Sequence, residues 1–183
     1  MNEYAALSRL IENLIRLGTV AEVDHGSLED NRPPRLRVQS GELLTGWLPW
    51  VAFRAGADAE WDPPTVGEQV VVFSPSGQTT QGIVLTGLFS QQYPANADRA
   101  GLHRRSYSDG AVIEYDSQSH TLMATLPDDG KVRLTAPGGV SILGDVDITG
   151  LVTITNDVIA AGISLVKHKH PGDSGGTTGA PLK

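Results

Sequence analysis

Two histidines near the end of the chain are the residues whose type and spacing best suit chemistry. His168 and His170 are separated by a single residue, so on an extended strand both imidazole rings face the same side. Imidazole nitrogens are common ligands of divalent transition metals, which makes this pair a candidate metal-binding motif. One chain supplies only two such ligands, and for an isolated monomer two solvated histidines on a frayed tail are the better explanation.

The segment before the histidine pair contains an internal repeat of six residues. Written in sixes, residues 134–163 read LTAPGG, VSILGD, VDITGL, VTITND and VIAAGI. The first and third positions are apolar in all five copies, and two inward positions around one outward residue make a very short strand. The fifth position is Gly or Asn, the residue types that best tolerate positive φ at a corner. Hexapeptide repeats of this kind are typical of β-helices.

The number of repeats predicts how this β-helix is built. Five copies complete less than two turns of a single-chain triangular coil, which is too little stacking to bury a core. We therefore expect three chains to form one shared prism, with Val146, Ile148, Val152 and Ile154 facing its axis. Such a homotrimer brings six imidazoles to one point. Six nitrogen ligands suit an octahedral divalent ion, and Fe(II), Ni(II) and Co(II) all fit that geometry.

The first ninety residues are expected to form a helix followed by a small barrel. Residues 3–17 carry Tyr4 and five aliphatic residues at helical spacing, and Gly18 is expected to end the helix. Five short β-type runs follow between turns, at 19–24, 35–39, 43–48, 69–73 and 81–88. This spacing fits a closed barrel of the OB type, and periodicity alone leaves a five-stranded sandwich open. Four aromatic residues belong either to the barrel core or to a contact with a partner protein, and the core is favoured for most of them: Trp47, Trp50, Phe53 and Trp61.

The second half of the chain is expected to contain a linker, more strands and a glycine-rich tail. Residues 91–108 are polar and lack both periods, which predicts a linker. Strand-like segments then follow at 109–116, 120–126 and 131–136. The tail at 171–181, PGDSGGTTGAP, is either disordered or a tight cap that folds back over a bound metal.

Other titratable residues are weaker candidates for function. Three histidines are isolated in sequence and are expected at the surface: His25, His103 and His120. Asp128 and Asp129 precede Gly130 and are expected in a turn rather than in a calcium site. Three acids fall at outward positions of the repeat, where solvation is the default: Asp145, Asp147 and Asp157.

Composition excludes several classes of function. The 183 residues contain no cysteine, which rules out disulfides, zinc–thiolate sites and cysteine catalysis. The formal net charge of −7, without a large basic face, argues against nucleic-acid binding. No run of about 18 apolar residues predicts a membrane helix, and the N-terminus does not resemble a Sec signal. Because no nucleophile elbow, P-loop or catalytic carboxylate pair is present, no enzyme activity is expected.

Two other functions are compatible with parts of the sequence. Hexapeptide-repeat acyltransferases are also trimers, and one of the two histidines, His168 or His170, would act as general base. Five repeats are too few for that fold, and both histidines lie beyond the repeat. An OB domain at 19–90 that binds single-stranded nucleic acid would need a basic groove, whereas this segment has an acidic balance.

Four segments carry a resemblance to a known family. They are TGWLPW at 45–50 with RAG at 54–56, VGEQVVVFSPSG at 66–77 with QGIVL at 81–85, SDGAVIEYD at 108–116, and HKHPG at 168–172 with the tail after it. In this order, over nearly the whole chain, they resemble the phage baseplate assembly protein V family. That family forms the spikes of P2-like contractile tails and of R-type bacteriocins.

The resemblance implies a mainly β fold in five parts. These are an N-terminal helix (1–18), an OB-fold collar (19–90), a linker (91–108), an intertwined trimeric β-helical shaft shaped as a triangular prism (109–166) and a metal-bound apex (167–183). It also implies one iron per trimer, held by His168 and His170 of each chain, although nickel and cobalt fit the same ligands.

The resemblance further implies a mechanical role rather than an enzymatic one. The collar is expected to dock on the baseplate hub, and sheath contraction to drive the tip through the outer membrane of the target cell. The protein would then sit at the baseplate tip of a virion or bacteriocin particle assembled in the bacterial host cytoplasm. The chain lacks an inserted lysozyme-like domain, so no muralytic activity is expected.

Overall fold

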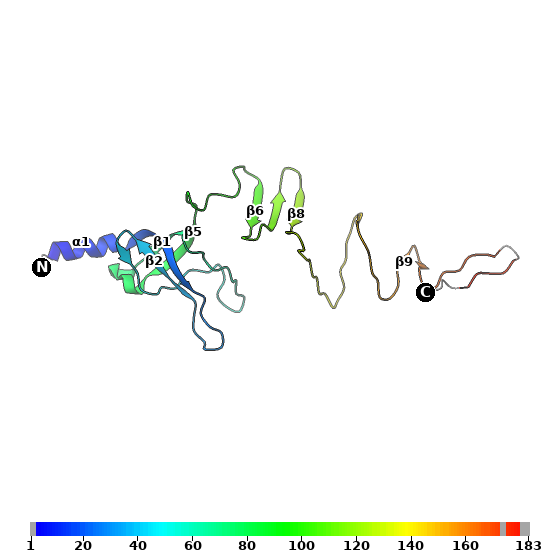
Figure 1. Ribbon diagram of the computed structural model, residues 1–183, viewed down its shortest axis with the longest axis horizontal. Coiled ribbons are helices and arrows are strands. Elements are labelled where there is room, and N and C mark those ends of the chain that lie inside the picture. Colours follow the sequence, from blue (N-terminus) through cyan, green and yellow to red (C-terminus); the bar gives the residue numbers. More distant parts are fainter. Residues whose placement is uncertain (1–2, 173–174, 180–183) are drawn as a thin grey trace. The chain divides into compact units, whose positions relative to one another are not determined.

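The computed structural model describes residues 3–172 and 175–179, and the chain divides into two compact units, Met1–Val132 and Arg133–Lys183 (Figure 1). The described residues of the first unit form one α-helix, two short 3-10 helices and two antiparallel sheets. Its elements are α1 (Glu3–Asn13), β1 (Ile15–Asp24), β2 (Arg35–Ser40), β3 (Leu43–Leu44), β4 (Gln69–Phe73), η1 (Pro75–Gly77), η2 (Thr79–Gln81), β5 (Ile83–Leu88), β6 (Leu102–Ser106), β7 (Val112–Asp116) and β8 (Thr121–Thr125). The second unit contains β9 (Ile159–Ala160) and β10 (Ile163–Ser164).

Helix α1 is shorter than the helix expected at 3–17, and that expectation is wrong beyond Asn13. Leu17 lies instead in β1, opposite Val71 of β4. Gly18 is not a helix stop either, because it lies within β1, against β2. A Cβ atom at Gly18 would lie 2.4 Å from a methyl carbon of Val38. Strand pairing has therefore overridden the helical spacing of the last leucines, and glycine is needed where two strands approach closely.

The first sheet has the strand order β3-β2-β1-β4-β5 and is antiparallel throughout. It closes on itself through the segment after β3. Leu48 exchanges two backbone hydrogen bonds with Leu36 of β2, and Val84 of β5 bonds Pro49 and Val51 on the same segment. The two edges of the sheet are thus joined, which confirms a closed barrel rather than a sandwich. The expected strand at 43–48 is correct as a β segment but regular only over Leu43–Leu44.

The barrel interior is small and aliphatic. Alternate residues of β2 and β4 are buried, as the period of a strand with one covered face requires. The fully buried cluster consists of Val20, Leu36, Val38, Leu48, Val70, Val72 and Val84. Burying side chains of this size contributes about 1.5–3 kcal/mol each, so the barrel has its own core within one chain.

The large aromatic residues mostly lie outside this core, contrary to expectation. Trp50 packs partly buried against the cluster. Trp47 lies beneath the guanidinium groups of Arg35 and Arg37, 5.7 and 5.9 Å from its ring centroid. Phe53 is 92% exposed, and Trp61 is exposed beside Trp50. Seven aliphatic side chains already fill the narrow interior, so the wide aromatic rings remain at its surface.

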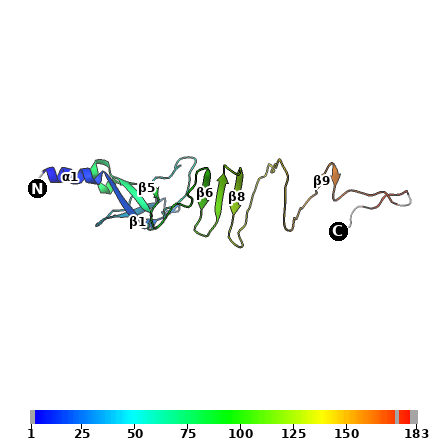
Figure 2. The ribbon, with the colours of Figure 1, turned by 90° about the horizontal axis from the view of Figure 1, so that it is seen from above.

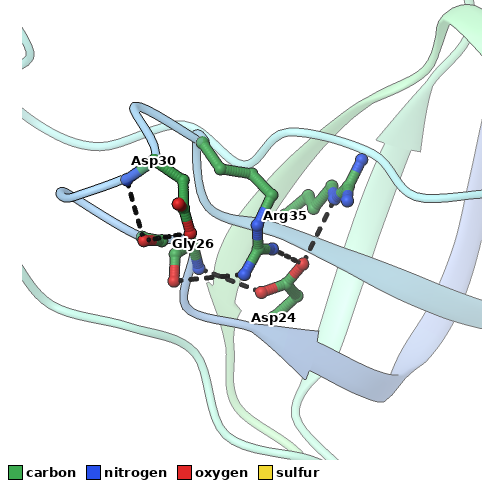
Figure 3. A network of polar contacts seen from close by, with 6 residues as sticks. Asp24, Gly26, Asp30 and Arg35 are labelled. Atoms are coloured by element: carbon green, nitrogen blue, oxygen red, sulfur yellow. Dashed lines mark hydrogen bonds and ion pairs between the residues drawn. The ribbon is translucent and has the colours of Figure 1, made fainter.

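The loop between β1 and β2 is fixed by a network centred on Asp24 (Figure 3). The Asp24 carboxylate accepts hydrogen bonds from the Gly26 amide, from Arg32 and from Arg35. The hydrogen bond from Arg32, with that from Gly26, lowers the pKa of Asp24 to about 2. Ser27 donates its hydroxyl to Asp30 and accepts the Asp30 amide, which closes the tip of the loop.

The second sheet is the three-stranded meander β6-β7-β8 (Figure 2). Strand β6 lies inside the segment expected as a linker, so that expectation is wrong over Leu102–Ser106, where every residue pairs with β7. Ion pairs Arg104–Glu114 and Arg99–Asp116 bind the former linker to β7. Because the residues that form these ion pairs are charged, the segment lacks the alternation of apolar residues by which a strand is predicted.

In the second unit, the repeat region forms no strand within one chain over residues 133–158. The expected strand at 131–136 is therefore not formed in the single chain. Corner glycines are partly confirmed: Gly144, Gly150 and Gly162 have positive φ, whereas at the first corner Gly139 has it in place of Gly138. The inward repeat positions are exposed, with Val146 at 58% and Ile148 at 61%. No helix among the described residues has the length and hydropathy of a membrane span.

Candidate metal-binding apex

A tight hairpin leads into the two histidines. Strands β9 and β10 pair with Ile163 opposite Ala160, which leaves only Ala161 and Gly162 in the turn. Both turn residues have positive φ, of 50° and 82°, as a type I′ hairpin turn requires. Glycine at the second position suits this turn, and the repeat pattern therefore ends in a chain reversal.

The segment after the hairpin is held by Asp157 and Ser164. The Ser164 hydroxyl donates to one Asp157 carboxylate oxygen at 2.6 Å and accepts the Lys167 amide at 2.9 Å. The other carboxylate oxygen accepts the Val166 amide at 3.1 Å. The hydrogen bond from Ser164 lowers the pKa of Asp157, because it stabilises the charged carboxylate. The solvated role expected for Asp157 is therefore wrong.

His168 is oriented by backbone carbonyls of the same segment. Its Nδ1 atom lies 2.9 Å from the Leu165 carbonyl oxygen and 3.1 Å from the Ser164 carbonyl oxygen. Carbonyl oxygens only accept hydrogen bonds, so this geometry assigns the ring proton to Nδ1. The lone pair is then on Nε2, the arrangement found in metal-binding histidines whose other nitrogen donates to the backbone.

The two imidazoles lie next to one another, as the spacing in the sequence predicts. Their ring centroids are 5.0 Å apart, and the ring planes are nearly perpendicular, at 89°. Two imidazoles in neighbouring positions of one octahedral ion have centroids about 4.5 Å apart, for a metal–nitrogen distance of about 2.1 Å. The observed separation is close to this value, which makes the pair a candidate for binding one ion. A third His, Cys, Asp or Glu close enough to complete a site is absent among residues 3–172 and 175–179.

The glycine-rich tail folds back on the strand of the histidines. His170 donates its amide to the Thr178 hydroxyl at 2.9 Å and accepts the Thr178 amide at 2.8 Å. An antiparallel bridge joins Pro171 to Thr177. The described part of the tail thus folds back on its own strand, and its role as a cap over a metal stays a prediction. Residues 173–174 and 180–183 of the predicted apex lie outside the described residues.

Sequence reasoning missed the residues that hold this apex, namely Asp157, Ser164 and Thr178. The available signal was a serine four residues before His168, because such hydroxyls often accept nearby backbone amides. The weaker candidates are placed elsewhere. His25, His103 and His120 are exposed as expected, and His25 contacts the Trp61 ring edge. Asp128 and Asp129 lie in a turn, also as expected.

Comparisons with known proteins agree with this division into barrel and apex. Residues 16–89 match the family model described as the type VI secretion system/phage-baseplate injector OB domain. Residues 162–181 match the GpV Apex motif, which spans β10 and both histidines. The chain is also similar to the "Spike protein" of Escherichia phage P2, with 32% identity over 213 aligned positions that cover 96% of each chain.

Proposed function

The chain belongs to the phage baseplate V spike family, and on this premise we propose that it works as the homotrimeric, membrane-piercing tip of a contractile tail. Its relative from phage P2 is a spike protein, so this chain has a phage tail spike role at the baseplate. The trimer, the metal and the piercing action are our proposal for how that role is performed.

One observation carries the proposal: the repeat presents apolar side chains that its own chain does not cover. Val152 and Ile154 are 53% and 52% exposed, like Val146 and Ile148 below them. A row of exposed aliphatic side chains at a fixed period is costly in water, and covering each contributes about 1.5–3 kcal/mol. Three copies placed around one axis cover these rows in a shared core. Folding of the shaft then depends on assembly of the trimer.

The apex histidines fit a metal shared by the same three chains. Each chain offers two imidazoles, so three chains complete an octahedral set for Fe(II), Ni(II) or Co(II). The metal supplies a cross-link between three chain ends, and a filled octahedron leaves no position for a substrate. The chain's own residues hold the His168 ring and close the tail over the histidine strand.

The opposite end of the chain suits attachment to the baseplate hub. Helix α1 exposes Leu7 and Ile11, and strand β1 exposes Ile15 and Leu17. A hub that covers these side chains would anchor the spike.

The proposed shaft suits mechanical load. Strand pairing between chains leaves few free strand edges, and the three chains of a trimer separate slowly. The shaft would therefore resist axial load as it crosses the outer membrane of the target cell. Such particles are assembled in the cytoplasm of the bacterial host.

The proposal is tested by native mass measurement combined with elemental analysis of the full-length protein. We expect three chains and one transition-metal ion per particle. The double change His168→Ala with His170→Ala should remove the metal and leave the trimer intact, because the repeat has its own apolar core. The matched control is His103→Ala with His120→Ala, two exposed histidines of the second sheet and its turn, which should retain the metal.

Two results would contradict the proposal. A wild-type monomer that unfolds cooperatively on its own would exclude the shared prism. Three metal ions per trimer, or none in protein never exposed to a chelator, would exclude a single six-histidine site.

A further inference from the structure

We propose that Asp157 is a positioning residue of the apex, which acts through Ser164 to hold His168 with its proton on Nδ1 and Nε2 available for the metal. This inference rests on the proposed metal apex. It assigns a function to an acid that lies eleven positions before the ligand and outside the histidine motif.

A path of hydrogen bonds leads from Asp157 to the segment that carries the ligand. One carboxylate oxygen accepts the Ser164 hydroxyl at 2.6 Å, and the other accepts the Val166 amide at 3.1 Å. Because the Ser164 hydroxyl hydrogen is used in this way, its oxygen is free to accept the Lys167 amide at 2.9 Å. Residues 164, 166 and 167 are thereby fixed to one carboxylate.

The residues fixed in this way place two carbonyl groups next to the His168 ring. The Ser164 carbonyl accepts the His168 backbone amide at 3.1 Å and lies 3.1 Å from ring Nδ1. The Leu165 carbonyl lies 2.9 Å from the same nitrogen. Both acceptors belong to the turn that Asp157 closes. If this turn opens, Nδ1 loses the two carbonyls that hold its proton, and the ring is free to rotate and to change tautomer.

Asp145 is an acid at the same position of the repeat as Asp157, but its surroundings differ. Asp145 and Asp157 both occupy the sixth position of a hexapeptide, two repeats apart. Asp145 is exposed and makes no hydrogen bond or ion pair within the described part of the chain. The contacts of Asp157 therefore do not follow from the repeat itself. They depend on the turn before His168, which is expected if the acid serves the ligand.

The experiment compares Asp157→Ala with the matched control Asp145→Ala in the full-length protein loaded with Fe(II). Metal release into excess chelator is followed by elemental analysis. Loss of a residue that orients a metal-binding histidine typically weakens metal affinity by about ten- to a hundredfold. We expect metal affinity to fall by about this factor in Asp157→Ala and to stay unchanged in Asp145→Ala. Native mass measurement should show trimers for both.

A second readout uses metal-free protein with labelled histidines. Long-range proton–nitrogen NMR correlations report which nitrogen of His168 carries the proton. We expect the Nδ1 proton in wild type and in Asp145→Ala, and a shift toward the Nε2 proton in Asp157→Ala. If Asp157 only stabilised the hairpin, its replacement would leave the His168 tautomer unchanged.

Ser164 variants keep the test decisive if Asp157→Ala fails to assemble. Ser164→Ala should reproduce both effects, and Ser164→Thr, which retains the hydroxyl, should restore wild-type behaviour. An unchanged tautomer in Asp157→Ala would overturn the role of Asp157, whether or not metal release changes. A wild-type protein that binds no transition metal would instead overturn the proposed metal apex, and the tautomer measurement would still decide whether Asp157 positions His168.

Discussion

At the scale of single residues, aspartates fix the turns that the chain depends on. Asp24 holds the β1–β2 loop, Asp116 pairs with Arg99 beside β7, and Asp157 closes the turn before His168. Hydrogen bonds from Arg99 and Gln118 hold the pKa of Asp116 well below its usual range, with Arg99 making the larger contribution. In each case the carboxylate accepts a backbone amide and at least one side-chain donor, which favours its charged form.

The Asp24 network predicts an acid-sensitive contribution to stability. The pKa of Asp24 is about 2 in the folded chain and about 3.8 without these contacts, so the unfolded chain binds the proton more readily. The contribution is therefore fully present above about pH 4 and is lost as the pH falls through about 2. Denaturant midpoints of wild type and Asp24→Asn, measured as a function of pH, should differ at neutral pH and converge in acid.

The control for this prediction is Glu42→Gln, because Glu42 is exposed in the turn between β2 and β3. Its midpoint should follow that of wild type at every pH. A difference between Asp24→Asn and wild type that persists unchanged at pH 2 would contradict the prediction.

At the scale of elements, α1 is joined to the barrel by a close backbone contact. Gly77 of η1 has φ +71°, and a Cβ atom there would lie 2.2 Å from the Leu10 carbonyl oxygen. Leu14, just after the helix, accepts the Ser74 amide at 2.9 Å. The helix therefore packs against η1, while Leu7 and Ile11 on it remain exposed.

This attachment predicts different results for two deletions that differ by four residues. Removing residues 1–13 deletes α1 but keeps Leu14 and all of β1, so the barrel should fold. Removing residues 1–17 also deletes three residues of β1, a strand paired on both sides, and should prevent barrel folding. Circular dichroism and thermal unfolding distinguish the two. If the variant that lacks residues 1–13 is incorporated into tails at the normal level, α1 has no role in hub docking.

At the scale of the whole molecule, the two units differ in how they bury apolar surface. The barrel covers seven aliphatic side chains within one chain, whereas the repeat leaves Val140, Val146 and Ile148 more than half exposed. We therefore expect the barrel to fold on its own and the stability of the repeat to depend on association of the proposed trimer.

Ile148→Asp tests this coupling. In the proposed prism it places three carboxylates in an apolar core, at a cost of several kcal/mol per charge. Trimers should fail to form at neutral pH, while the barrel retains its structure. Thr149→Asp is the control, because Thr149 occupies the adjacent outward position and should assemble normally. Sedimentation measures both. Equal assembly of the two variants would mean that the third repeat position does not face the interior.

The sequence alone determined the features that local pattern encodes. Strand β4 was predicted at its observed bounds. The one-residue spacing of His168 and His170 was enough to predict neighbouring imidazoles. The period of the repeat identified its apolar positions and most of its corners. Each of these depends on residues close together in the chain, where alternation and backbone preference act directly.

Tertiary structure decided what depends on distant residues. Pairing with β2 and β4 turned the end of the expected helix into β1, and pairing with β7 turned part of the expected linker into β6. A narrow aliphatic core left Trp47 and Phe53 outside. Asp157 became part of the apex only because a hairpin brings it to Ser164. Hydrogen-bond partners and the space left in a core are set by folding of the chain, so no local pattern contains them.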